Sequence, residues 1–369
     1  MSDKKYDLVF EGGGAKGAVF VGALKEFYAR GCTPRRLIGT SAGAITATLL
    51  AAGFKPEELE KAVSEKKGNK SIFVSFLDVP ERNFFSDKDI QDSDTLDIFK
   101  TLEKESMFFM FSSWIKNNLI GALLYIPPYR NLFNFIECGG VFAGEEFRRW
   151  IQGKMKEKGY TDPEITLGDF YKKTSVDLSV VASDTTNSTM LVLNHRTAPD
   201  CPVAWAVRMS MSIPFVWSEV RWRKEWGTYL DNKIEGHRIV DGGLLSNFPI
   251  DLIKEQPVAN SEKEKIMGTE QANEAGSIGL LIDETLAVEG QLEREKADIV
   301  GKLKTIQRIG RLVDTMRTAH DNKEMEKNKQ LVCRLPAKGY GTTEFNMGDD
   351  RRDKLIAAGQ EAMKQYLKI

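Results

Sequence analysis

The N-terminal segment alternates between the hydrophobic patterns of strands and helices. The apolar run Tyr6–Phe10 is typical of a short buried strand, and the apolar spacing over Ala18–Phe27 predicts a helix. A second strand is predicted at 35–40 (RRLIGT), and a helix of small residues follows at 41–53. Strands that alternate with helices in this way indicate a parallel α/β sheet.

The rest of the chain continues this pattern. Strands are predicted at 175–186, 188–195, 237–250 (where the strand runs into a glycine turn) and 276–283. Helices are predicted near 144–158, at 202–214 (where Pro214 ends the helix) and over 284–331, a long charged stretch with one apolar face.

The segment Met107–Ile136 is the most apolar and aromatic part of the sequence. Polar residues and a Pro-Pro pair interrupt it, so it contains no run of about 20 apolar residues that could cross a bilayer. Two interpretations stay open: a buried helical subdomain, or a partly exposed cap that contacts lipid or acyl chains. The side chains expected at such a contact are Phe108, Phe109, Phe111, Trp114, Leu123 and Tyr125.

Composition and charge exclude some classes of partner. The chain is 41% hydrophobic and 28% charged with a net charge of −1, so no overall positive field attracts nucleic acid. The N-terminal apolar run is too short for a secretory signal, and the four cysteines lack the spacing of a metal site. We therefore expect a cytoplasmic chain with no metal, no signal peptide and no transmembrane helix.

The turn between the first predicted strand and the first predicted helix contains four glycines: Gly12, Gly13, Gly14 and Gly17. Such a turn gathers backbone N–H groups at the positive end of a helix, which predicts a site for a negative charge. The spacing also fits a dinucleotide-binding loop, but the second strand carries no acidic residue at its end to hold a ribose. A P-loop is excluded as well, because Gly17 follows the lysine of the loop.

The sequence GTSAG follows the second strand and spans Gly39 to Gly43. A G-x-S-x-G turn between a strand and a helix is typical of a nucleophile elbow, in which a strained turn holds the serine hydroxyl exposed. Ser41 is therefore the candidate nucleophile. The structural alternative is a serine that only caps the following helix.

A serine nucleophile needs a base, and two kinds of residue compete for this role. The chain holds three histidines, none with an obvious acidic orienter: His195, His237 and His320. Asp241 instead ends a predicted buried strand and precedes Gly242 and Gly243, the same strand-and-glycine arrangement as the other two motifs. A carboxylate can act directly as a general base, so Asp241 is the preferred candidate.

In this order, the motifs GGGAKG, GTSAG and DGG resemble the signature of patatin-like phospholipases, which are related to the catalytic domain of cytosolic phospholipase A2. The segments 181–196, 206–215 and 340–347 are also similar to that family, so the resemblance covers the chain apart from an insert at about 70–140. It implies a three-layer α/β/α sandwich with a mostly parallel sheet. We expect a catalytic core at 6–254 that contains the apolar cap insert, with 255–369 completing the same domain.

The resemblance also implies a reaction. Ser41 and Asp241 would form a Ser–Asp dyad, and the backbone N–H groups of Gly12, Gly13 and Gly14 would form the oxyanion hole, with no cofactor. The expected activity is that of a phospholipase A that cleaves the acyl esters of membrane glycerophospholipids through an acyl-enzyme.

Two other functions remain as alternatives: a broad carboxylesterase or thioesterase, which the apolar segment disfavours, and a catalytically silent lipid-binding protein. The expected partner is a phospholipid membrane, to which the active protein binds peripherally. An activator, either a protein or a cyclic nucleotide, and the oligomeric state are left open.

Overall fold

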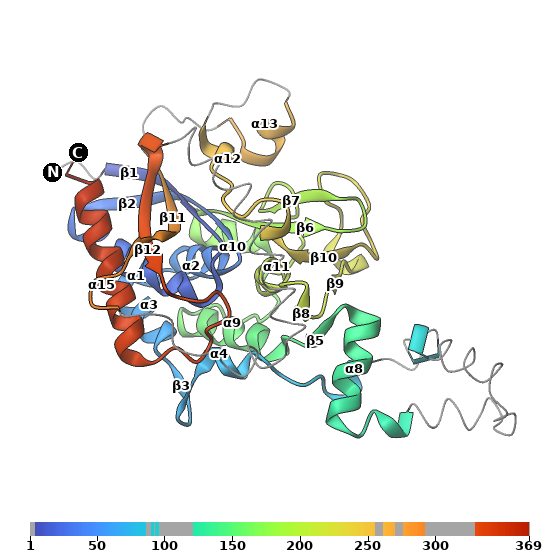
Figure 1. Cartoon of the computed structure of the whole chain (residues 1–369). Helices are drawn as coiled ribbons and strands as arrows, with labels where there is room; N and C mark the ends of the chain where they lie inside the picture. Colours follow the sequence, from blue (N-terminus) through green and yellow to red (C-terminus); the bar gives the residue numbers. More distant parts are fainter. Residues whose placement is uncertain are drawn as a thin grey trace, which may run out of the picture.

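The structure is a computed structural model that describes residues 4–85, 90–91, 93–95, 121–254, 261–269, 276–291 and 329–368. Its main sheet has eight strands in the order β12-β11-β1-β2-β6-β10-β9, with β7 pairing to β6 (Figure 1). These strands are β1 Lys4–Phe10, β2 Cys32–Thr40, β6 Asp177–Asp184, β7 Thr189–Leu193, β9 Val220–Arg221, β10 Arg238–Asp241, β11 Gly276–Ala287 and β12 Val332–Lys338.

Most of the central strands run parallel. β12, β11, β1, β2 and β6 pair in parallel with their neighbours, whereas β10 and β7 pair with β6 in antiparallel fashion. The C-terminal strands β11 and β12 thus extend the same sheet that the N-terminal strands begin. The prediction of an α/β fold with a mostly parallel central sheet is confirmed.

Alternate strand residues face opposite sides of the sheet and enter two hydrophobic clusters. Leu8 of β1 and Leu37 of β2 belong to the larger cluster, whereas Val9 and Ile38, their successors in sequence, belong to the smaller one. Because both faces of a parallel sheet need cover, helices lie on each side. The result is three layers.

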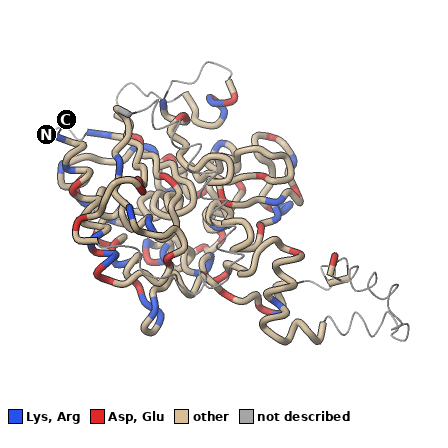
Figure 2. Tube along the Cα trace, in the orientation of Figure 1, with Lys and Arg blue, Asp and Glu red and all other residues tan. Residues whose placement is uncertain are grey.

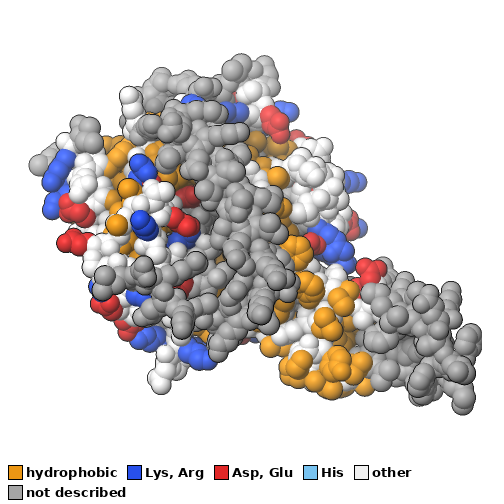
Figure 3. Space-filling view, viewed as in Figure 1, with side chains coloured by type: hydrophobic (Ala, Val, Ile, Leu, Met, Phe, Trp, Pro, Cys, Tyr) orange, Lys and Arg blue, Asp and Glu red, His pale blue; other side chains and the backbone are white. Residues whose placement is uncertain are grey.

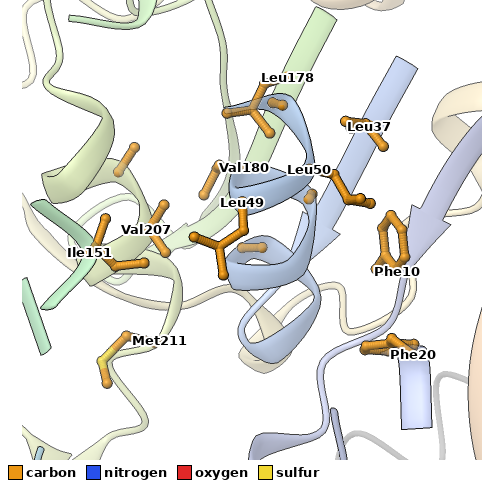
Figure 4. Packing of buried hydrophobic residues seen from close by; sticks show 14 of the residues in the cluster. Phe10, Phe20, Leu37, Leu49, Leu50, Ile151, Leu178, Val180, Val207 and Met211 are labelled. Atoms are coloured by element: carbon orange, nitrogen blue, oxygen red, sulfur yellow. The ribbon is translucent and has the colours of Figure 1, made fainter. Parts of the chain in front are cut away.

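The larger cluster is covered by long helices. Figure 4 shows Leu49 and Leu50 of α2 among side chains from the sheet and from α11, and α1 packs along α15. The helices bounded within the described residues are α1 Val19–Ala29, α2 Ala42–Ala51, α3 Pro56–Val63, α4 Ile72–Ser75, α8 Pro127–Cys138, α9 Glu145–Glu157, α10 Leu167–Thr174, α11 Val203–Ser210, α12 Asp251–Lys254, α13 Glu262–Met267 and α15 Asp349–Tyr366.

The smaller cluster receives Ile266 and Met267 from α13. Short 3-10 helices and small strands complete the architecture. The 3-10 helices are η1 Gly14–Ala18, η2 Arg82–Phe84, η3 Lys224–Trp226, η4 Gly242–Leu244 and η7 Lys329–Leu331. The small strands form two separate pairs: β3 Lys66–Lys67 with β4 Lys70–Ser71, and β5 Gly140–Phe142 with β8 Phe215–Trp217.

Two predicted helix boundaries are wrong. The helix predicted to end at Pro214 ends at Ser210, because the N–H groups of Ser212 and Ile213 donate to Met209 and Met211 instead of to residues four positions back. The strand predicted to end at Asp283 continues to Ala287, where it still pairs with β12, so no helix begins at 284. The remainder of that predicted helix, 292–328, lies outside the described residues.

The apolar insert is described at its two ends. Phe108, Phe109, Phe111 and Trp114 lie outside the described residues. Beyond them Leu123 is half-buried and Tyr125 is exposed, and α8 follows at the edge of the molecule (Figure 1). Within the described part of the chain, no helix has the length and apolar content needed to cross a membrane.

Candidate active site

Ser41 occupies a sharp turn between β2 and α2. Its backbone has φ 53° and ψ −119°, a left-handed conformation that is costly for a residue other than glycine. Ser41 is the N-cap residue of α2, yet its side chain makes no capping hydrogen bond. The capping interpretation is therefore wrong, and the strained turn expected of a nucleophile elbow is present.

The expectation that the Ser41 hydroxyl is exposed is wrong. Ser41 is only 3% exposed, because aromatic side chains from distant parts of the sequence close around it. A cavity of about 50 Å³ adjoins Ser41, and its apolar lining consists of Ile45, Phe73, Phe76, Phe147, Met211, Ile213, Trp217 and Phe345.

Close packing explains the glycines of the elbow. A Cβ atom on Gly43 would collide with the carbonyl oxygen of Phe10 in β1, and one on Gly39 would collide with the backbone of Gly43. A Cβ atom on Gly17, in η1, would lie 2.8 Å from the Cβ atom of Ala42. These glycines let the first turn of α2 lie directly against β1 and η1.

Asp241 ends β10 and is completely buried. Its Oδ1 accepts a hydrogen bond of 2.7 Å from the N–H of Gly243 in η4. A Cβ atom on Gly242 would collide with the carbonyl oxygen of Val181 in β6, so this glycine lets η4 lie directly against β6.

The sheet register brings Ser41 and Asp241 to the same level. Thr40 pairs with Val181 of β6 on one side, and Asp241 pairs with Ala182 on the other side. Ser41 follows Thr40, so Ser41 and Asp241 flank β6 at Ala182, with β2 and β10 about 10 Å apart as two strand spacings. Ala182, Ile239 of β10 and the cavity residues belong to the larger hydrophobic cluster, so Asp241 faces the side of the sheet on which the cavity lies.

The segment Ser210–Ser212 holds both residues by their backbones. The Ser210 hydroxyl accepts a hydrogen bond of 2.9 Å from the N–H of Ser41 and donates one of 2.6 Å to the carbonyl oxygen of Val181. The carbonyl oxygen of Ser212 accepts a hydrogen bond of 2.9 Å from the N–H of Asp241. The sequence motifs assign no role to these two serines. Their only local signal is that serines interrupt an otherwise apolar stretch.

Arg208 supports this segment from α11. Its guanidinium group donates hydrogen bonds to the hydroxyl of Ser212 and to the carbonyl oxygens of Ala143 and Ser218. Complete burial lowers the pKa of Arg208 to about 10, so the side chain remains charged at neutral pH.

The glycine loop is held by residues from distant parts of the sequence. The N–H of Gly12 donates a hydrogen bond of 3.0 Å to the carbonyl oxygen of Asn247, and the Asn247 side chain donates one of 3.1 Å back to the carbonyl oxygen of Gly12. The N–H of Ala15 donates to Thr342, and Lys16 forms a salt bridge with Glu284. The C-terminal third of the chain thus fixes the loop.

Because the N–H of Gly12 is engaged with Asn247, it is not available to bind an oxyanion in this conformation. The N–H groups of Gly13 and Gly14 donate to no acceptor among the described residues. Gly14 has φ +55°, and a Cβ atom there would collide with Thr342. Gly12 itself lies against the nucleophile candidate, since a Cβ atom on it would lie 3.2 Å from the Cβ atom of Ser41.

The structure gives His237 and His195 acidic neighbours that the sequence does not indicate, since Nδ1 of His195 lies 4.0 Å from Oδ1 of Asp177. His237 does have an acidic partner, because its Nδ1 lies 2.7 Å from Oδ2 of Asp184. Asp184 is two residues beyond Ala182 along β6, so this pair lies away from the level of Ser41. The ring of His195 stacks on Tyr171 with the ring centroids 3.6 Å apart. His320 lies outside the described residues.

Two further features concern ligands. A larger cavity of about 820 Å³ has mostly charged walls, including Arg148, Arg223 and Glu145, and is lined by neither Ser41 nor Asp241. The described residues contain no group of three or more His, Cys, Asp or Glu side chains that could hold a metal ion.

Comparisons with known proteins place this geometry in a family. The chain is 28% identical over 369 residues to the uncharacterized protein YqhO of Bacillus subtilis, covering 98% of both chains. It is 23% identical over 257 residues to the probable lipid hydrolase 463L of Invertebrate iridescent virus 6, covering 69% of this chain and 66% of the relative. The crystal structure of VipD from Legionella pneumophila is similar with 16% identity and a TM-score of 0.46, covering 100% of this chain and 67% of VipD. Residues 8–253 match the family model of the patatin-like phospholipases, and the chain belongs to this family.

Proposed function

We propose that the protein is a phospholipase A that hydrolyses fatty-acyl esters of membrane glycerophospholipids with Ser41 as nucleophile and Asp241 as general base. Membership of the family supports lipid hydrolysis. The observation that carries the finer proposal is the sheet register, which sets the strained Ser41 and the buried Asp241 on either side of Ala182.

The proposed reaction has two steps. Asp241 accepts the Ser41 proton while the hydroxyl oxygen attacks the ester carbonyl carbon, and the N–H groups of Gly13 and Gly14 hold the resulting oxyanion. One such donor commonly contributes about 3–4 kcal/mol to the transition state. The leaving lysophospholipid alkoxide takes the proton from Asp241. Water, deprotonated by Asp241, then attacks the acyl-enzyme, and the fatty acid leaves as Ser41 regains a proton.

The cavity beside Ser41 would receive the acyl chain. Its walls are apolar and aromatic, as a fatty-acyl chain requires, and Met211 in the Ser210–Ser212 segment forms part of them. Its volume of about 50 Å³ is far below the roughly 300–1,000 Å³ of ligand sites. An acyl chain therefore enters only when the lining side chains move apart, and segments 72–76 and 211–217 and Phe345 contribute walls from loops and short elements.

The test is product analysis on a defined phosphatidylcholine with different acyl chains at its two positions. Mass spectrometry should detect a lysophospholipid and a fatty acid with the wild type, and neither with Ser41→Ala or Asp241→Asn. A fluorophosphonate should label Ser41. The double variant should be little worse than either single one, because the two residues act as a unit.

His237→Ala is the matched control, since its imidazole pairs with Asp184 and not with Ser41. Loss of activity in His237→Ala with unchanged stability, together with full activity in Asp241→Asn, would replace the dyad with a histidine mechanism. Hydrolysis of short esters or acyl thioesters without phospholipid cleavage would favour the broad esterase. Failure to turn over any ester would favour the silent lipid-binding protein.

A further inference from the structure

An apolar stripe lies on the outer face of α8 and the two residues before it. Its five members are all exposed and none carries a charge: Tyr125, Ile126, Tyr129, Leu132 and Ile136. Tyr125 is 62% exposed and Leu132 is 55% exposed. Residues 129, 132 and 136 follow helical spacing, so they share one face of α8. Figure 3 shows hydrophobic side chains gathered in the lower right of the molecule, where Figure 1 places α8.

Two buried residues beside and opposite the stripe anchor α8 to the body of the protein. Phe133 is buried, and its ring centroid lies 4.9 Å from that of Phe85. Asn134 is also buried and donates hydrogen bonds of 2.7 Å to the carbonyl oxygen of Gly140 and 2.8 Å to the hydroxyl of Ser218. Phe133 and Asn134 hold α8 in place, so the exposed stripe is apolar surface that the described core does not use.

Phe215 connects α8 with the wall of the Ser41 cavity. Phe215 is an exposed aromatic residue between Ile213 and Trp217, both of which line that cavity. The ring centroid of Phe215 lies 6.1 Å from that of Phe135 on α8. Phe215 also has φ 67°, an unusual conformation for a bulky side chain. Segment 213–217 therefore lies between α8, which carries the stripe, and the candidate site.

We propose that the α8 stripe, together with Phe215, is the surface by which the protein docks on the lipid–water interface that contains its substrate. This inference rests on the proposed function. A lipid surface fits better than a protein groove because α8 lies outside the layers of the main sheet (Figure 1) and its stripe is exposed rather than recessed. Tyr125 and Tyr129 suit the boundary between headgroups and acyl chains, where amphipathic aromatic rings gather, and the guanidinium carbon of Arg82 lies 4.0 Å from the centroid of the Tyr125 ring.

Charge plays little part in this docking. Figure 2 shows Lys and Arg interspersed with Asp and Glu along the tube, and the net charge of the chain is −1. Binding therefore depends on the burial of apolar side chains and tolerates salt, which would weaken attraction between exposed charges.

The experiment measures partition onto vesicles of diether phosphatidylcholine, a neutral lipid that has no ester to cleave. Sedimentation should show that Leu132→Ser and Tyr129→Ser each weaken binding about fivefold, because each removes part of an apolar side chain from the interface. High salt should leave wild-type binding unchanged. Val79→Ser is the matched control, since Val79 is 38% exposed but lies outside the stripe, and it should bind as the wild type does.

Two further measurements separate this inference from its rivals. Phe133→Ser should lower the melting temperature, whereas Leu132→Ser and Tyr129→Ser should not. Leu132→Ser, Tyr129→Ser and the control Val79→Ser should all hydrolyse a short soluble ester at the wild-type rate. If the wild type hydrolyses no ester but the stripe variants still weaken vesicle binding, the proposed function fails and the docking surface stands.

The docking proposal is overturned by unchanged vesicle binding of Leu132→Ser and Tyr129→Ser. It is also overturned if these variants lose stability as Phe133→Ser does, which would mean that the stripe packs against this chain. A wild-type dimer in sedimentation analysis that Leu132→Ser dissociates would likewise assign the stripe to a second copy of the chain.

Discussion

Replacing Ser210 by alanine removes the hydroxyl that holds the backbone of Ser41. The hydroxyl accepts from the N–H of Ser41 at 2.9 Å and donates to the carbonyl oxygen of Val181 at 2.6 Å, and Ser210 is completely buried. Ser210→Ala leaves two buried polar groups without this partner, each worth about 1–3 kcal/mol. We expect the free energy of unfolding to fall by about 2–6 kcal/mol.

The same substitution should slow the chemistry. Ser41 has φ 53°, a conformation that costs about 1–3 kcal/mol and persists only where the surroundings enforce it. Without the Ser210 hydroxyl, the turn can relax, and the strained conformation must be regained before attack. A cost of that size corresponds to a rate about 5- to 150-fold lower.

The assay compares the rate of fluorophosphonate labelling at Ser41 with the free energy of unfolding in urea. Ser179→Ala is the matched control, because Ser179 is a buried serine of β6 whose hydroxyl accepts a hydrogen bond of 3.1 Å from Asn194, away from the elbow. Both variants should be less stable, but only Ser210→Ala should label slowly. A wild-type labelling rate in Ser210→Ala would show that Ser210 only fills space and would refute the reasoning.

Three further outcomes follow from the structure. Gly14→Ala should reduce kcat on a soluble ester more than it raises KM, because its Cβ atom would collide with Thr342 and turn the adjacent N–H groups away; an unchanged kcat would remove Gly14 from the oxyanion hole. Burial raises the pKa of Asp283, but hydrogen bonds from Thr285 and Arg334 outweigh it and hold that pKa below 3.8. The folded state thus favours the ionised form, and its stabilisation is present above about pH 4 and lost as pH falls through the lowered pKa. Asp283→Asn should therefore lower the free energy of unfolding at neutral pH and weaken its acid dependence, and identical urea curves for both proteins across this range would contradict the assignment. EDTA should leave hydrolysis unchanged, and strong inhibition by EDTA would contradict the proposed dyad chemistry.

Much of the fold follows from local patterns in the sequence. Strand β1, helix α1, strand β2 and helix α2 lie where the apolar spacing predicts them, because a short buried strand and an amphipathic helix impose different periods on the same chain. The glycines of the GTSAG turn could also be predicted, because they meet a local steric requirement. A turn from strand to helix with no room for a Cβ atom, as at Gly43 beside Phe10, requires glycine whatever the rest of the chain does.

Other features depend on partners that are distant in sequence. The strand β11 continues past Asp283 because β12 pairs with it, and α11 ends at Ser210 where that residue binds the elbow of Ser41. Asp184 pairs with His237 across the antiparallel contact of β6 with β10, so no nearby residue signals it.

The candidate site likewise combines features that are local in the sequence with features that depend on distant partners. The candidate reacting groups and the turns that carry them could be predicted from the sequence alone, since a G-x-S-x-G turn and a strand-end carboxylate are local features. The burial of Ser41, the hydrogen bond between the N–H of Gly12 and Asn247, and the contact of Ser210 with Ser41 are visible only in the folded structure. Burial and hydrogen-bond partnership are properties of pairs of groups in space, and folding brings these pairs together from positions that no local pattern connects.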